Sequence, residues 1–265
     1  MTAGASAQAE EAPARDWLLF GSQRLWMAAF EANVVDAAVT LPPGSSTPVL
    51  RTSAKSITAS DLVPITTLGV RVGSFGGFVS VLPQVNTAAS GQVAGGSFRR
   101  SEHDIGFSYQ LTPSLAMSLI RKWGKFAPTT SPEAQALLGA TGKQEGVGTL
   151  LGLSASAPLE ERLSLFANLG YGPGRFKTSQ LFGQTVKTKA QYTLAEMGLT
   201  YRLLGPGAIR GVNNVSVQLG YRLQVVDFRD AQLPTLALNG TPIATEVVKL
   251  RASTQGLALG LSAVF

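Results

Sequence analysis

Apolar and polar residues alternate along this chain in segments of about ten residues, and this pattern limits the fold more than any other feature. The segment that begins at Val215 shows it best, because Val, Val, Leu, Tyr, Leu and Val occupy every second position up to Val225. Ser, Gln, Gly, Arg and Gln fill the positions between them. A period of two is that of a β-strand with one apolar and one polar face. The chain is therefore predicted to be all-β.

Further segments with the same period predict ten strands, with eight or twelve strands as alternatives. In the first strand, Trp26 and Phe30 are assigned to the apolar face and Glu31 and Asn33 to the polar one, and residues 17–23 are expected to extend it. The other aromatic residues assigned to apolar faces are Phe107, Tyr109, Tyr171, Tyr201 and Tyr221. The predicted strands are residues 24–37, 62–74, 77–84, 102–112, 114–126, 145–157, 161–173, 189–204, 212–227 and 248–265.

The apolar faces point to a membrane, but not to one crossed by helices. A transmembrane helix needs roughly 20 apolar residues in a row, and the best candidate, Trp17 to Phe30, contains Gln23 and Arg24. The mean hydropathy of +0.17 is high for a soluble protein and low for a helical membrane protein. In lipid, only helices and closed barrels satisfy all backbone hydrogen bonds. The alternation therefore predicts a transmembrane antiparallel up-and-down β-barrel.

The connections between the predicted strands alternate between long and short. Outer-membrane barrels have short periplasmic turns and long extracellular loops, whereas a soluble β-sandwich has no reason for this alternation. The long connections are expected near residues 38–61, 85–101, 127–144, 174–188 and 228–247, and the short ones near 73–77, 112–114, 158–161 and 205–207.

The last predicted strand ends the chain, with Leu257, Leu259, Leu261 and Ala263 alternating up to a final Phe265. In this respect the chain resembles the bacterial outer-membrane β-barrel superfamily, in which a terminal aromatic residue serves as the signal read by the barrel-assembly machinery. The resemblance implies an outer-membrane location, contact with outer-membrane lipid and lipopolysaccharide, and a role for Phe265 as the assembly signal. An even number of strands would leave both termini on the periplasmic side.

The polar faces of the strands would line the lumen of the barrel. Barrels of about eight strands are filled by side chains and open channels appear near 16 strands, so ten strands favour a lumen filled by ion pairs and hydrogen bonds. The alternative is a narrow, anion-preferring pore that uses the arginines of these faces, Arg71, Arg162, Arg202 and Arg222. The lumen-lining candidates are Arg71, Lys122, Arg162, Glu196, Arg202, Gln218, Arg222 and Gln224, with Glu31, Asn33, Asp104, Gln110, Asn168, Lys249 and Arg251 on the same faces.

Candidate catalytic residues are few. His103 is the only histidine, and it lies between Glu102 and Asp104 at the predicted extracellular end of a strand. Here the chain resembles the omptins, ten-stranded outer-membrane proteases that use Asp and His residues at this rim. Their Asp-x-His pairing is absent, because Asp104 directly follows His103 and so faces the opposite side of the strand. Asp227 and Asp230 end another strand and would have to supply the carboxylates.

Other classes of chemistry find little support in the sequence. The chain has no cysteine and one histidine, so we expect neither a metal site nor a thiol nucleophile, and we assign no cofactor. The net charge of +6 is spread over single basic residues between apolar ones, which argues against a nucleic-acid partner. A His-x-Ser pair, as in outer-membrane lipases, and a phosphate-binding glycine motif are both absent from the sequence.

The chain is predicted to comprise an N-terminal tail or signal-peptide remnant, residues 1–14, and a barrel, residues 15–265. The leading functional hypothesis is a non-enzymatic scaffold or interaction protein, which could form part of a larger envelope complex with a protein partner. A narrow diffusion channel for small polar or anionic solutes is the second hypothesis, and an omptin-like surface protease the third.

Overall fold

The computed structural model describes residues 17–88, 90–91, 97–129, 143–179, 185–237 and 242–265, which form one closed β-barrel. The predicted tail, residues 1–14, lies outside this part. None of the described residues belongs to a helix long and apolar enough to cross a membrane. The strands are β1 (Trp17–Thr40), β2 (Val49–Val72), β3 (Phe75–Ala88), β4 (Ser90–Gly91), β5 (Ser97–Thr112), β6 (Leu115–Thr129), β7 (Gln144–Pro158), β8 (Leu163–Ser179), β9 (Thr185–Leu204), β10 (Asn214–Ala237) and β11 (Pro242–Val264).

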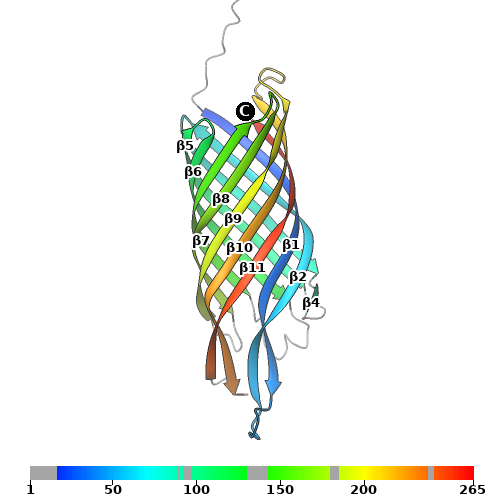
Figure 1. The fold of residues 1–265 in the computed structure, drawn as a ribbon, viewed down its shortest axis with the longest axis vertical. Coiled ribbons are helices and arrows are strands. Elements are labelled where there is room, and N and C mark those ends of the chain that lie inside the picture. Colours follow the sequence, from blue (N-terminus) through cyan, green and yellow to red (C-terminus); the bar gives the residue numbers. More distant parts are fainter. Residues whose placement is uncertain (1–16, 89, 92–96, 130–142, 180–184, 238–241) are drawn as a thin grey trace, which may run out of the picture.

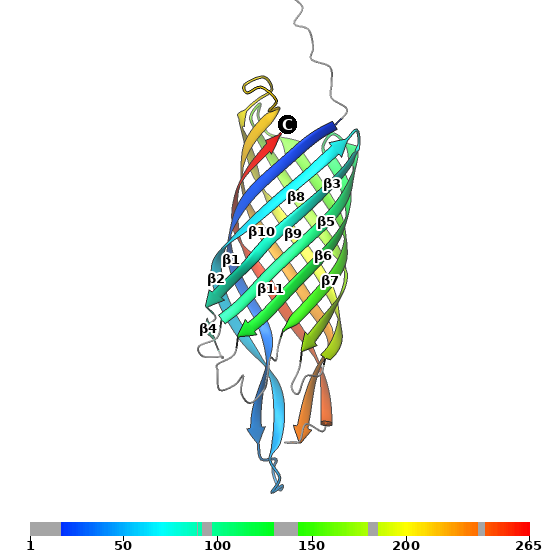
Figure 2. The same ribbon diagram turned by 180° about the vertical axis from the view of Figure 1, so that it is seen from behind.

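Each long strand pairs antiparallel with its neighbour in the chain, and the first and last strands close the ring (Figures 1 and 2). The order around the wall is β1, β11, β10, β9, β8, β7, β6, β5, β3, β2, and β2 pairs with β1 again. The two-residue strand β4 only adds to the side of β2. The predicted ten-stranded antiparallel up-and-down barrel is therefore confirmed.

The two ends of the barrel differ. At one end, here called the terminal end, lie Trp17, Phe265 and the shorter turns, such as Gly73–Ser74 and Pro113–Ser114 (Figure 1). Gly73 has a φ of 56°, which favours glycine in a two-residue hairpin turn. At the other end, here called the distal end, the hairpins β1–β2 and β10–β11 extend beyond the wall.

The two distal hairpins correct the predicted loops at residues 38–61 and 228–247, which are mostly strand. The β1–β2 ladder continues to Thr40 and Val49, and the β10–β11 ladder continues to Leu236 and Pro242. Near the tips, β10 also pairs with β2 through three residue pairs. The sequence pattern missed these segments because strands outside lipid no longer need an apolar outer face.

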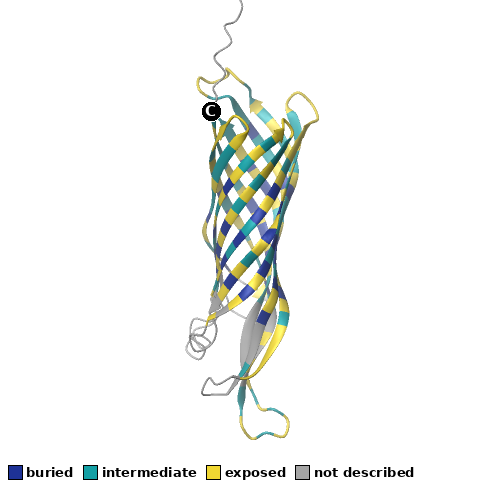
Figure 3. Cartoon of the chain, turned by 90° about the vertical axis from the view of Figure 1, so that its left-hand side faces the viewer, coloured by how far each residue is buried: buried dark blue, intermediate teal, exposed yellow. Residues whose placement is uncertain are grey.

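Inward and outward residues alternate along each strand, so bands of buried and exposed residues wind around the barrel (Figure 3). The outer face carries a belt of large exposed apolar side chains, as a lipid-facing surface requires. The predicted outward positions at the C-terminus are confirmed, because every second residue from Leu257 to Phe265 points out.

The predicted faces of the first strand are wrong. Strand β1 begins at Trp17 as expected, but Trp26 and Phe30 point into the lumen and are buried, whereas Leu25 and Met27 are exposed outside. Both faces of this segment are apolar, so hydropathy alone cannot tell them apart.

Four of the predicted lumen residues, Glu31, Asn33, Lys249 and Arg251, lie on the outer face instead. Glu31, Lys249 and Arg251 are exposed there, and Arg251 contacts Asp227 at 3.6 Å. Asn33 accepts a hydrogen bond from the backbone N–H of Arg251 across the β1–β11 seam. These positions lie on distal parts of their strands, where polarity no longer marks the inner face.

Candidate functional site

The candidate site is the lumen, which is crossed at mid-height by a layer of buried charged side chains. Arg100 and Glu102 come from β5 and Lys122 from β6, and their side chains are 0%, 4% and 2% exposed. All three point inward because they continue the alternation of their strands. Buried charges are tolerated only when they are paired, and these are: Glu102 accepts from Arg100 Nε at 2.7 Å and contacts Lys122 Nζ at 2.5 Å.

Hydrogen bonds carry this layer across the lumen. The side-chain amide of Gln224 on β10 donates to Glu102 Oε1 at 3.0 Å. Strands β5 and β10 are five places apart in either direction around the ring, so this bond joins opposite walls. Arg100 also reaches Thr254 on β11, donating to its hydroxyl at 2.6 Å. The layer therefore spans the lumen rather than lining it.

A second cluster of charges lies beside this layer, toward the terminal end. Glu196 on β9 accepts from Arg24 on β1 at 2.7 Å and from Arg222 on β10 at 3.1 Å. Lys122, which contacts Glu102 in the charged layer, also pairs with Asp104, with Nζ 3.0 Å from Oδ1. Four cations, Arg24, Arg100, Lys122 and Arg222, thus meet three anions, Glu102, Asp104 and Glu196.

Aromatic rings contribute to holding the cations of this network. The Arg100 guanidinium lies 5.0 Å from the ring centre of Phe30, 5.3 Å from that of Phe126 and 5.7 Å from that of Trp26. Arg222 lies 5.2 Å from the Trp26 ring on the other side. Cation–π attraction stabilises guanidinium groups that have left water. Trp26 therefore ties the two charge clusters together.

Distal to the charged layer, the lumen is filled by apolar side chains from most of the strands. The ring of Phe176 is central, with ring centres of Phe228 at 4.8 Å, Tyr192 at 5.7 Å and Phe126 at 6.3 Å. Such ring pairs add to the stabilisation by burial. The other buried members of this distal cluster include Phe30, Ile57, Leu82, Ala190, Val226, Ala231 and Leu250.

Glycines on neighbouring strands make room for these rings. A Cβ atom at Gly146 would lie 2.3 Å from the Phe176 ring, and one at Gly174 would lie 2.4 Å from the Tyr192 ring. Each ring therefore lies against bare backbone, which brings it into contact with the wall and stiffens the sheet. The distal half of the lumen is a packed core and not a water channel.

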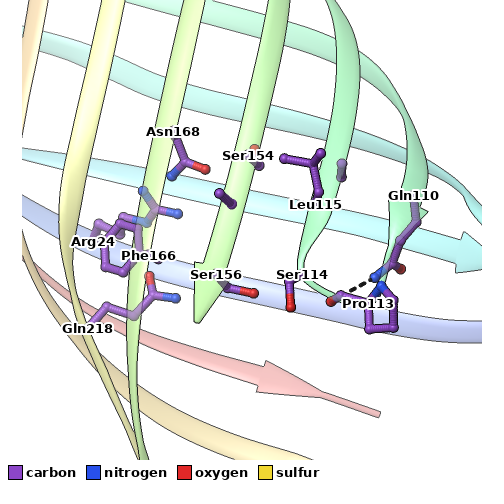
Figure 4. Close-up of a pocket in the computed structure, with 12 residues that line it drawn as sticks. Arg24, Gln110, Pro113, Ser114, Leu115, Ser154, Ser156, Phe166, Asn168 and Gln218 are labelled. Carbon is purple, nitrogen blue, oxygen red and sulfur yellow. Dashed lines mark hydrogen bonds between the residues drawn. The ribbon is translucent and has the colours of Figure 1, made fainter. Parts of the chain in front are cut away.

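The terminal half of the lumen is open by contrast, and both polar and apolar side chains line it. One cavity of about 280 Å³ and another of about 340 Å³ share Arg24, Ser154 and Asn168 in their linings. Figure 4 shows Arg24, Asn168 and Gln218 gathered on one side of the smaller cavity, with Gln110 bonded to the Pro113 carbonyl at 3.2 Å on the other. We call this space the terminal basin.

Of the residues predicted to line the lumen, eight come together in the network or the basin: Lys122, Glu196, Arg222, Gln224, Gln218, Asp104, Gln110 and Asn168. Arg71 and Arg202 lie at the terminal mouth, where Arg71 donates to Gln110 at 2.9 Å and Arg202 donates to the Glu161 carbonyl at 2.6 Å. The placement of Arg162 is corrected, because it is exposed in the turn between β7 and β8 and lies beyond the wall. The four arginines of the channel hypothesis therefore do not lie together: Arg222 is in the network, Arg71 and Arg202 are at the mouth, and Arg162 is exposed in a turn.

Sequence reasoning missed Arg24, Arg100 and, as a lumen residue, Glu102. Glu102 already lay within the predicted strand 102–112, on the same face as Asp104, and an extension by two residues would have placed Arg100 inward as well. Arg24 was hidden by the inverted faces of β1. For Glu102 and Arg100 the signal was the alternation of inward residues that starts at Asp104. For Arg24 it was the alternation along β1, which could be recognised only once the faces of that strand were known.

The candidate catalytic residues are not brought together. His103 lies on the outer face of β5, whereas Asp104 points inward toward Lys122. Asp227 lies on β10, on the opposite side of the ring. No group of three His, Asp or Glu residues that could hold a metal ion exists among the residues that the structure describes.

Comparison with known proteins supports the fold. No family model and no curated protein sequence matches the chain. Among solved structures, the outer membrane protease OmpT from Escherichia coli is similar with a TM-score of 0.50 and 11% identity, covering 94% of this chain and 97% of that one. At this identity the likeness shows the fold alone.

Two looser matches are a FadL homologue from Pseudomonas aeruginosa and Ail, the attachment invasion locus protein of Yersinia pestis. The first has a TM-score of 0.36 at 10% identity and covers 94% of this chain and 90% of the other. The second has a TM-score of 0.33 at 12% identity and covers 93% of this chain and 98% of the other. Neither is similar enough to add to the OmpT comparison. The fold is that of a bacterial outer-membrane β-barrel.

Proposed function

We propose that this bacterial outer-membrane β-barrel is a non-conducting scaffold whose lumen is permanently closed. The observation that carries the proposal is the hydrogen bond between Gln224 and Glu102, which joins opposite walls inside a fully buried layer. An ion passing this layer would have to separate Glu102 from Arg100 and Lys122, and the apolar distal cluster would then deny it water. Breaking a buried ion pair costs about 3–5 kcal/mol.

The scaffold would act through its distal end. The two distal hairpins project beyond the wall, and their β2–β10 pairing joins them into one platform. Val39, Leu41, Ile243 and Val247 are exposed on it. We propose that this platform lies outside the cell and contacts a protein partner of the envelope. Both termini would then be periplasmic, as the short turns of the terminal end favour.

Phe265 fits the proposed role of an assembly signal. It lies on the outer face at the terminal end, and its backbone N–H donates to the Leu19 carbonyl at 2.8 Å. The residue thus ends the strand that closes the barrel against β1. The barrel-assembly machinery would read it before this closure.

A narrow channel is the second candidate, and the terminal basin is the observation that favours it. The basin gives small polar solutes access to Arg24 at about the middle of the barrel. Conduction would still require the charged layer and the distal cluster to move aside. An omptin-like protease is not supported, because His103 and Asp227 face outward from opposite sides of the ring.

Single-channel recording of the folded protein in a planar bilayer tests the closed lumen. We expect no discrete current steps at salt concentrations where an open pore would conduct. Heat-modifiable gel migration of the same preparation verifies that the barrel is folded. Discrete, anion-selective steps that shrink when Arg24 and Arg222 are replaced by Gln would overturn the proposal and put the channel in its place.

Two sets of substitutions, made separately and together, show which layer of side chains keeps the bilayer free of current. Phe126→Ala, Phe176→Ala and Phe228→Ala together empty the distal cluster, and Arg100→Ala, Glu102→Ala, Lys122→Ala and Asp104→Ala together remove two cations and two anions. Combining both sets should open the barrel and produce steps, whereas either set alone should leave it silent. Steps from one set alone would show that the other layer does not seal the lumen.

A further inference from the structure

Four cations stand directly opposite one another on the outer face of β8 and β9. Arg175 pairs with Lys189 and Lys177 pairs with Lys187 in the ladder between these strands, and all four side chains are exposed. Directly opposite side chains have Cβ atoms about 4.5–5.5 Å apart, and like charges in this arrangement destabilise a sheet. We call these four residues the β8–β9 basic patch.

Little within the described part of the protein neutralises this patch. The Lys189 ammonium lies 4.0 Å from a carboxylate oxygen of Asp230. Glu145 is the cross-strand neighbour of Lys177, but its carboxylate pairs with the Lys143 ammonium at 3.2 Å. Lys125 lies on the other side of Glu145 and adds another positive charge. A sheet in which four such cations have so few internal partners gains stability from an external anion.

The patch begins where the lipid-facing belt ends. On β8 the outward residues Leu165, Leu169 and Tyr171 precede Arg175, and on β9 Met197 and the outward positions after it are largely apolar. The four cations thus lie just beyond the belt, on the distal side. No outward-facing cation is found on the described terminal halves of these two strands. The charge therefore marks one leaflet surface and not both.

We propose that the β8–β9 basic patch binds the phosphate groups of a phosphorylated lipid in the distal leaflet, which in an outer membrane is lipopolysaccharide. Rows of Lys and Arg beside a membrane surface attract anionic headgroups. Residues on one face of a strand repeat about every 6.6–6.8 Å, so the four cations form a block that two neighbouring phosphates can bridge. The acyl chains of the same lipid would lie on the belt residues Leu169 and Tyr171. The assignment to lipopolysaccharide rests on the proposed extracellular position of the distal end, and not on whether the lumen conducts.

Binding of bisphosphorylated lipid A to the detergent-solubilised full chain, measured by native mass spectrometry, tests the proposal. We expect binding of this probe and weak or no binding of a dephosphorylated analogue. Lys177→Gln with Lys187→Gln should raise the dissociation constant at least about tenfold. The matched control, Arg99→Gln with Lys249→Gln, removes two exposed cations from other distal strands and should change it less than about twofold.

A stability measurement separates a binding site from general attraction. In an uncharged detergent, Lys177→Gln with Lys187→Gln should raise the thermal midpoint, because it removes a like-charge pair. With lipid A present, this gain should vanish or reverse. Equal loss of binding in the patch and control variants would overturn the proposal, as would equally tight binding of the dephosphorylated analogue. Displacement of lipid A by a soluble acidic peptide would assign the patch to a protein partner instead.

Discussion

The distal and terminal halves of the lumen are built from the same alternating strands, yet one is a packed core and the other an open basin of mixed polar and apolar lining. In the distal half, Phe126, Phe176 and Phe228 meet ring against ring. In the terminal half, Ser154, Asn168 and Gln218 leave room for water. The charged layer separates the two. The strand number sets the width of the lumen, but the size of the inward side chains decides whether it is closed.

Charged side chains also lie in different environments in the two halves. Around Glu102 the charges are out of water and must be paired, whereas Arg71 and Gln110 meet at the open mouth, where water can replace either partner. A lost partner therefore costs much more in the layer than at the mouth. Three substitutions test the contrast in charge and packing between the two halves, in order of expected effect.

The largest effect is expected from Glu102→Gln, which keeps the shape of the side chain and removes its charge. Arg100 and Lys122 would then lose their shared buried partner, which destabilises a protein by about 3–5 kcal/mol. Urea unfolding in lipid vesicles, followed by tryptophan fluorescence, measures the change. A loss below about 1 kcal/mol would mean that the layer is hydrated and that the contrast between the halves is weaker than the burial indicates.

An intermediate effect is expected from Gly174→Ala in the packed half. The new methyl group would lie 2.4 Å from the Tyr192 ring, so the ring must leave the wall, at a cost of about 1–3 kcal/mol. Gly77→Ala is the matched control, because the new methyl group would lie 4.0 Å from its nearest neighbour, the Gly106 carbonyl oxygen. Unfolding midpoints of the two variants in the same vesicles should differ clearly. If they coincide, the rings of the distal cluster are free to repack.

The smallest effect is expected from Arg71→Ala at the terminal mouth. Its bond to Gln110 is exposed, and exposed polar pairs contribute at most about 1 kcal/mol. The unfolding free energy should stay within about 0.5 kcal/mol of that of the unchanged protein. A larger loss would indicate that the mouth is as tightly organised as the charged layer, and would erase the difference between the halves.

Much of the fold could be predicted from the sequence, because lipid imposes one rule on every strand that crosses it. Wherever only one face was apolar, as at Leu219 and Tyr221 or from Leu257 to Phe265, the outward residues followed directly. The rule failed in two places. At Trp26 both faces are apolar, and at Lys249 and Arg251 the strand lies beyond the belt, where lipid no longer selects the outer face.

The candidate site was less predictable, because its contacts join strands that are far apart in the chain. Lys122, Glu196, Arg222 and Gln224 were recognised as inward residues, but not which of them meet. Glu102 and Gln224 are 122 residues apart in sequence and touch only because their strands lie opposite in a ring of ten.

The sequence by itself determined the fold class and most of the lipid-facing sides, and it favoured ten strands over eight or twelve, since a period of two and an apolar belt are local properties. The tertiary structure alone decided that a charged layer crosses the lumen, that Trp26 joins two charge clusters, and that Arg175 and Lys177 face Lys189 and Lys187. Register and ring position set these contacts, and both depend on how whole strands align when the barrel closes.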